Sequence, residues 1–167
     1  MKFYISGKIG KEIPSPETLA KFKEAEDMLK AKGFDTFNPT TSGLGDLAEL
    51  LTRFRLSLHQ EITDEDIQKR RMRNWYECIL ALDIEELTFC DAIYMMSDYM
   101  ESPDSRVELA FALATGKQIF FASREHAVLY LEDVWRAGNK VMKMRTPRYK
   151  YVDLNLQKTW IPISAIE

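Results

Sequence analysis

Short, nearly continuous apolar runs alternate along the chain with longer segments in which apolar residues recur every three or four positions. The run at 2–6, KFYIS, is typical of a strand buried on both faces of a parallel sheet. A helix is predicted from Ser15, an N-cap with Pro16 at the first helical position, to the stop at Gly33. Its apolar face is Leu19, Phe22, Ala25, Met28 and Leu29. A second short strand at 34–39 completes a βαβ unit, which implies a right-handed crossover.

The second half of the chain continues this alternation after a less regular segment. Residues 46–60 are spaced like a helix, whereas 61–74 are polar and charged and predict a loop with a helical start. A firmer helix runs from Trp75 to Cys90, with its apolar side at Ile79, Leu82, Leu87 and Phe89. Strands are predicted at 91–97 and 117–123, on either side of a helix at 105–115. A helix at 125–138 follows, and Pro162 makes the late segment 160–164 an edge strand or a docking segment.

This order of elements predicts a three-layer α/β/α fold, Rossmann-like or flavodoxin-like, with a small and mainly parallel sheet. The 167 residues fit a single domain. We expect a helical insertion at about 41–74 and an irregular tail at about 139–167.

Composition narrows the class of protein. The net charge of −3, from 23 basic and 26 acidic residues, offers no basic stripe for polymeric nucleic acid. No apolar run reaches the roughly 18 residues of a membrane span, and the start MKFYISGKIG lacks a signal-peptide core. The two cysteines and two histidines show no metal-ligand spacing. We therefore expect a soluble cytoplasmic protein with reduced thiols, no membrane partner and no metal.

One carboxylate stands out from its surroundings. Glu108 is the polar residue within an apolar stretch of the predicted helix SRVELAFALAT. A buried glutamate without a partner costs several kcal/mol or becomes protonated. A glutamate in a first helical turn is also favourable with the helix dipole, which is the structural explanation. Because this turn follows a strand of a parallel sheet, a catalytic role is the competing interpretation.

Ligands of open α/β sheets bind outside the carboxyl ends of the strands. The loops at those ends carry the candidate substrate-binding residues Ser6, Gly7, Lys8, Lys11, Asn38, Asp98, Ser102, Ser105 and Arg106. Lysines beside flexible backbone suit an anion such as phosphate, although a solvated turn explains the same residues. The chain has neither a phosphate-binding P-loop nor a dinucleotide-binding G-x-G-x-x-G motif.

A second carboxylate, Asp83, precedes the strand-opening Asp91 by eight residues. It is either a solvent-facing aspartate of an amphipathic helix or a partner of Glu108. Two carboxylates that converge on one site suit cleavage at an anomeric carbon, where one attacks or stabilises the sugar and another group moves the proton.

Three segments resemble the nucleoside 2-deoxyribosyltransferase superfamily, which includes 2′-deoxynucleoside 5′-phosphate N-hydrolases and small phage and bacterial members. They are KFYISG at the start, CDAIYMMSD, and the pattern S-x-x-x-x-x-E-L-A-x-A-x-x-x-G-K from Ser102 to Lys117. The resemblance covers roughly 2–40 and 75–122. It implies a homo-oligomer in which a neighbouring subunit completes the pocket, and chemistry without a cofactor.

The resemblance also implies roles for individual residues. Glu108 matches the nucleophile that attacks C1′ of deoxyribose, Asp83 the residue that handles the proton at the base, and Tyr4 the residue that orients the glutamate. Ser102 matches a position that is serine in the monophosphate hydrolases, which together with Lys8 and Lys11 favours a nucleotide substrate.

Residues 103–106 depart from the family pattern. Asp104 stands where the family usually has glycine, and Pro103 and Arg106 replace small residues. Asp104 would repel a phosphate unless Lys8, Lys11 or Arg106 compensates.

The sequence thus predicts cleavage or transfer at the N-glycosidic bond of 2′-deoxynucleosides or their 5′-monophosphates. The alternatives are a non-catalytic nucleotide-binding module of the same fold and an NAD-type glycohydrolase.

Overall fold

A computed structural model describes residues 1–10, 13–58, 64–123 and 125–127, with the backbone alone for 64–70. Lys11 lies outside the described residues, as do the predicted helix beyond Ala127 and the tail from Asn139.

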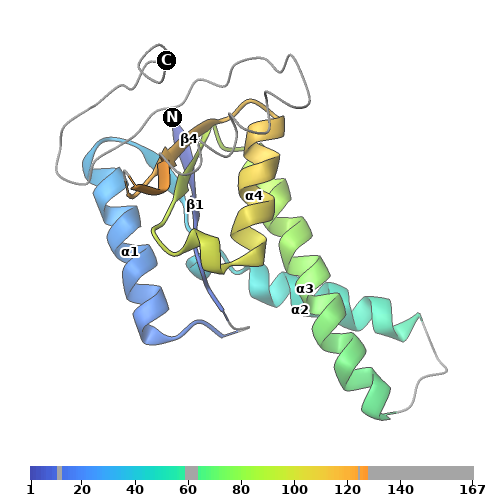
Figure 1. Ribbon diagram of the computed structural model, residues 1–167. Coiled ribbons are helices and arrows are strands. Elements are labelled where there is room, and N and C mark those ends of the chain that lie inside the picture. Colours follow the sequence, from blue (N-terminus) through green and yellow to red (C-terminus); the bar gives the residue numbers. More distant parts are fainter. Residues whose placement is uncertain (11–12, 59–63, 124, 128–167) are drawn as a thin grey trace.

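The described chain forms a parallel sheet flanked by helices (Figure 1). The strands are β1 (Lys2–Ser6), β2 (Asp35–Phe37), β3 (Ala92–Met95) and β4 (Gln118–Phe121). The α-helices are α1 (Pro16–Ala31), α2 (Leu44–Ser57), α3 (Asp64–Thr88) and α4 (Pro103–Ala114), and short 3₁₀ turns cover Pro39–Thr41 and Tyr99–Glu101. All neighbouring strands pair in parallel in the order β2-β1-β3-β4. The predicted three-layer α/β fold is confirmed.

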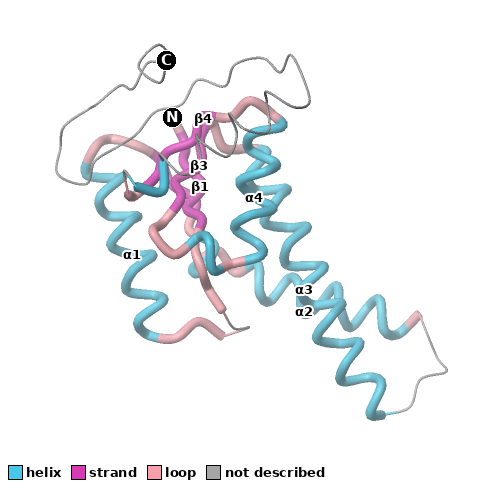
Figure 2. Tube along the Cα trace, viewed as in Figure 1, coloured by secondary structure: helices cyan, strands magenta, loops and turns pink. Residues whose placement is uncertain are grey.

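Alternation along the strands produces two separate core clusters, one on each face of the sheet. Helix α1 lies on one side of the sheet and α4 on the other (Figure 2). Phe3 and Ile5 of β1 pack with Phe22 and Leu29 of α1 on one face. Tyr4 of β1 points to the other face, where Leu109 of α4 completes the cluster. The even-numbered residues of β1 therefore face α4.

Helix α1 begins and ends as predicted. The Ser15 side chain accepts a hydrogen bond from the amide of Thr18 at 3.2 Å. Gly33 adopts a positive φ of 80°, and its amide donates to the carbonyl oxygen of Lys30, which closes the helix. Leu19 was expected on the buried face but is 40% exposed. It lies in the first turn of α1, and the buried residues of the helix begin only at Phe22.

Two predicted boundaries are wrong. The segment 61–74 was expected to be mainly loop, yet α3 is a single 25-residue helix from Asp64. Charged residues are good helix formers, and an ion pair of 2.7 Å between Arg71 and Glu49 ties this part of α3 to α2. At the other end Phe89 follows α3 and is 67% exposed, because it lies beyond the last helical residue, Thr88.

Smaller corrections apply to two helix starts. Helix α2 begins at Leu44 rather than near residue 46. Helix α4 begins at Pro103 rather than at residue 105, with Ser102 as its N-cap. Within the described part of the chain, no helix is both long enough and apolar enough to cross a membrane.

Candidate functional site

The carboxylate of Glu108 receives two hydrogen bonds from β1. The Tyr4 hydroxyl donates to Oε1 at 2.8 Å, and the Ser6 hydroxyl donates to Oε2 at 2.5 Å. Both donors come from the strand face that α4 covers, because residues two apart in a strand share a face. The Glu108 side chain is only 5% exposed, so both of its oxygens are oriented by buried partners.

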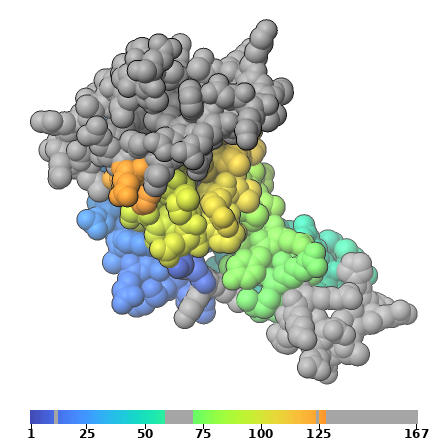
Figure 3. Space-filling model, viewed as in Figure 1, coloured from blue at the N-terminus to red at the C-terminus, as the bar shows by residue number. Residues whose placement is uncertain are grey.

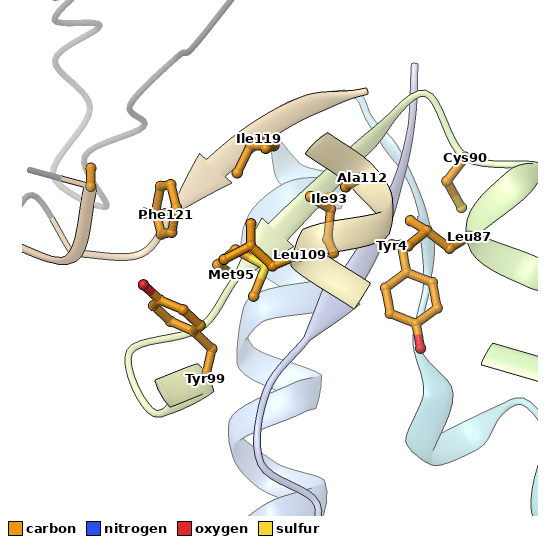
Figure 4. Close-up of a cluster of buried hydrophobic side chains, with 11 residues drawn as sticks. Tyr4, Leu87, Cys90, Ile93, Met95, Tyr99, Leu109, Ala112, Ile119 and Phe121 are labelled. Carbon is orange, nitrogen blue, oxygen red and sulfur yellow. The ribbon is translucent and has the colours of Figure 1, made fainter. Parts of the chain in front are cut away.

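Packing around Tyr4 explains how these groups are held in place. Its ring lies in the same cluster as Leu87 of α3 and Ala112 of α4, and its hydroxyl points out of that cluster (Figure 4). The ring also stacks on Phe37 of β2 with centroids 5.4 Å apart. Three elements of the fold therefore fix the hydroxyl that orients Glu108.

Asp83 belongs to the same buried group. It projects from α3, is 6% exposed, and its Oδ1 has no hydrogen-bond partner among the residues that the structure describes. Burial and the negative charge of Glu108 together raise the pKa of Asp83 to about 8, against the opposing hydrogen bond of the Tyr4 hydroxyl. The environment therefore favours the protonated form of Asp83, which has a proton to donate.

The pKa of Glu108 is shifted in the same direction. Burial raises its pKa to about 7, while the hydrogen bonds from Ser6 and Tyr4 lower it. Burial together with the charges of Glu108 and Asp83 holds the pKa of Tyr4 well above its usual range, so the phenol stays a donor. Because burial raises both pKa values and the charge of Glu108 opposes ionisation of Asp83, the pair favours a state with one carboxyl ionised and one protonated, which supplies both a nucleophile and an acid.

The loops that follow β1 and β3 approach each other closely. A Cβ added at Gly7 would lie 2.8 Å from Met96 Sδ and 3.1 Å from Asp98 Oδ1, so this position has no room for a side chain. Asp98 Oδ1 accepts the amide of Lys8 at 3.2 Å. Lys21 of α1 donates to the other Asp98 oxygen and to the carbonyl oxygen of Lys8.

Sequence reasoning missed Lys21, because a surface-type residue on an amphipathic helix gives no signal that it bridges two distant loops. Asp98, one of the predicted substrate-binding residues, has its carboxylate committed to this bridge.

Several predicted binding residues have structural partners instead of facing Glu108. The Asn38 side chain accepts from the amide and hydroxyl of Thr40 and donates to Glu26, so it caps the 3₁₀ turn after β2. Lys8 Nζ forms an exposed ion pair of 2.8 Å with Glu101.

The predicted binding residues at the start of α4 differ in burial and in their hydrogen-bond partners. Ser102 and Ser105 are buried and bonded to each other at the N-cap, and Arg106 is exposed. Gly7 and Lys8 lie in the loop after β1, and Lys11 is not described. The structure thus gathers Tyr4, Ser6, Asp83 and Glu108. Ser6, predicted to touch substrate, bonds the carboxylate.

Within the described residues no group of three or more histidine, cysteine, aspartate or glutamate side chains is arranged to hold a metal ion.

Comparison with known families gives one match. Residues 1–121, which contain strands β1–β4 and helices α1–α4, match the family model described as a domain of unknown function, DUF4406. The chain belongs to this family. No curated protein and no solved structure matches the chain.

Proposed function

We propose that this protein cleaves, or transfers across, the N-glycosidic bond of a 2′-deoxynucleoside-type substrate, with Glu108 as the nucleophile. The observation that carries the proposal is the carboxylate of Glu108, buried and held on both oxygens by Tyr4 and Ser6, together with the second buried carboxyl group of Asp83. A salt-bridged structural glutamate would have a cationic partner; Glu108 has two neutral hydroxyl donors. Membership in the deoxyribosyltransferase superfamily, which the three sequence segments favour, is part of the same proposal.

The reaction balances with these residues alone. An oxygen of the ionised Glu108 forms a bond to C1′ of the sugar while the bond from C1′ to the base nitrogen breaks. The electron pair of that bond stays on the base, and Asp83 supplies the proton that neutralises it. Tyr4 and Ser6 hold the attacking carboxylate in one orientation throughout.

A second step releases the enzyme. Water or another base attacks C1′, the ester to Glu108 breaks, and the carboxylate of Asp83 takes up the proton that the incoming group loses. Hydrolysis and transfer differ only in the acceptor.

The test is release of free base from the common 2′-deoxynucleosides and their 5′-monophosphates, followed by chromatography with and without a second base. We expect Glu108→Gln to reduce release by about 10³-fold or more, because the amide cannot attack C1′. Glu77→Gln is the matched control, since Glu77 is a half-exposed partner of Arg73 on α3.

Absence of release by the wild-type protein from every substrate would reject the proposal, and so would undiminished release by Glu108→Gln. The same panel separates the alternatives. A binding module would gain thermal stability from a nucleotide without releasing base, and an NAD-type glycohydrolase would release nicotinamide from NAD.

The homo-oligomer implied by the resemblance stays a prediction, which light scattering of the full chain would check.

A further inference from the structure

We propose that this site selects uncharged nucleosides and rejects their 5′-monophosphates, and that Asp104 sets this selection. The inference rests on the proposed function for the type of substrate. It reverses the preference for a nucleotide that Ser102 and the loop lysines suggested. Three features of the described residues support it: the start of α4, the position of Asp104, and the partners of the nearby cations.

The first turn of α4 has almost no backbone donors left for an anion. A helix start normally binds phosphate through its free amides. Pro103, the first helical residue, has no amide hydrogen. The amide of Ser105 donates to the Ser102 hydroxyl at 3.3 Å, and that of Arg106 donates to the Ser102 carbonyl oxygen at 3.2 Å. Of the first four residues of α4, only Asp104 has an amide without a partner among the residues that the structure describes, and its own side chain is a carboxylate.

Asp104 places that carboxylate close to the reacting group. It precedes Glu108 by four residues in α4, so the two side chains lie on the same face one helical turn, about 5.4 Å, apart. Asp104 is partly buried, and its negative charge acts on both Glu108 and Asp83. A sugar whose C1′ contacts Glu108 would carry a 5′-phosphate well within a Debye length, about 8–10 Å, of Asp104. The phosphate would therefore meet a field of like charge.

The described cations near this edge do not compensate. Lys8 is paired with Glu101, and Lys21 is bonded to Asp98 and to a backbone carbonyl. Arg106 makes no ion pair with any residue that the structure describes, and it is exposed. It lies two positions before Glu108, about 200° around the helix, and therefore on the opposite side of α4. The charges of Lys8 and Lys21 are thus each balanced by a neighbouring carboxylate, and Arg106 lies on the other side of the helix.

Selection is tested by measuring both binding and turnover on the full-length protein. Isothermal titration with 2′-deoxynucleosides and the corresponding 5′-monophosphates gives affinities that do not depend on catalysis. We expect the wild-type protein to bind the nucleoside at least tenfold more tightly than the monophosphate, and to release base in the same order. Raising the salt concentration should narrow the gap, because screening weakens the repulsion.

Asp104→Asn removes the charge and keeps the shape of the side chain. We expect it to reduce the ratio of nucleoside to monophosphate affinity by about tenfold. The control is Asp27→Asn, which makes the same change in net charge at an exposed i,i+4 pair with Lys23 and should leave the ratio within twofold.

Each outcome of these measurements either supports or overturns the proposed selection. Tighter binding of the monophosphate by the wild-type protein, an unchanged ratio in Asp104→Asn, or no binding of either ligand would overturn the inference. Selective binding of the nucleoside without release of base would support the inference and reject the proposed reaction. Release of base mainly from the monophosphate would reject the inference and support the proposed reaction.

Discussion

The carboxyl edge of the sheet and the pair formed by α2 and α3 differ in which side chains they bury. Polar side chains are buried at the sheet edge, whereas apolar side chains are exposed on the helix pair. At the sheet edge two carboxylates are almost fully buried, Glu108 at 5% and Asp83 at 6% exposure. In α2, which extends with α3 away from the sheet (Figures 1 and 3), Leu50 and Phe54 are more than 60% exposed. One region thus buries polar groups where apolar groups are expected, and the other exposes apolar groups where polar groups are expected.

This difference distinguishes residues that stabilise the fold from residues that serve the candidate site. Buried carboxylates cost free energy of folding, and a protein keeps them where their altered acidity is used. The apolar clusters packed on the sheet offset this free-energy cost. Tyr4 and Leu87 are fully buried in one of them. The exposed face of α2 contributes little to that stability, so substitutions in the two regions should have very different effects.

The largest effect is expected from the core beside the site. Leu87→Ala should lower the free energy of unfolding by about 2–5 kcal/mol, because it leaves a cavity next to Tyr4. Phe54→Ala removes a larger side chain from α2 and should cost no more than about 0.5 kcal/mol, since Phe54 is 61% exposed. Urea unfolding of both variants measures the contrast. Equal losses would show that the exposed face of α2 is covered in solution.

The next effect has the opposite sign. The folded-state pKa of Asp83, about 8, lies above its ordinary value of 3.8, so its contribution to stability is present at low pH and is lost as pH rises from about 4 to about 8. Asp83→Asn removes the ionisable group. Relative to the wild-type protein, we expect the stability of this variant to rise by about 3–4 kcal/mol between pH 5 and pH 9.

Urea unfolding at pH 5, 7 and 9 measures this dependence. Asp46→Asn, on the exposed side of α2, is the control and should leave the pH dependence as it is in the wild-type protein. Equal pH dependence of the wild-type protein and Asp83→Asn would show that Asp83 is not held in its protonated form.

A smaller effect is expected at the hydroxyl that orients Glu108. Tyr4→Phe keeps the ring in its cluster but removes a donor to a buried carboxylate, at a cost of about 1–2 kcal/mol in stability. Without that donor the pKa of Glu108 rises above its present value of about 7. If the proposed reaction is correct, the rate at pH 7 falls about tenfold and the rising limb of the pH–rate profile moves to higher pH. A uniform loss at all pH values would instead indicate that Tyr4 contacts the substrate.

Much of this arrangement follows from the sequence. The strand period places Tyr4 and Ser6 on one face, and the isolated carboxylate in an apolar helix identifies Glu108. Asp83 could have been assigned with more certainty, since it precedes the buried Leu87 by four residues and so shares its helix face. The start of α4 could also have been found, because Ser102 and Pro103 repeat the Ser15 and Pro16 signature that correctly predicted α1.

Other features could not be predicted. The bridge from Lys21 to Asp98 joins positions 77 residues apart, and nothing local specifies such a contact. The commitment of Lys8 to Glu101 is likewise a product of tertiary structure, although lysine beside glycine suggested a phosphate site. Local patterns thus singled out the carboxylates, whereas the ion-pair partners of Lys8 and Lys21 depend on the tertiary fold.

The smallest effect is expected from a surface ion pair on α2, away from the candidate site. Arg53 donates to Glu49 at 2.8 Å across one turn of α2, and its side chain is 76% exposed. Solvent screens such a pair, so Arg53→Ala should change the free energy of unfolding by no more than about 0.5 kcal/mol. Arg71 also bonds Glu49, but it is 29% exposed and joins α3 to α2. Urea unfolding of Arg53→Ala and Arg71→Ala in parallel should therefore show the larger loss for Arg71→Ala. The reverse order would contradict the expectation that the Arg71–Glu49 pair between the helices contributes more to stability than the exposed Arg53–Glu49 pair within α2.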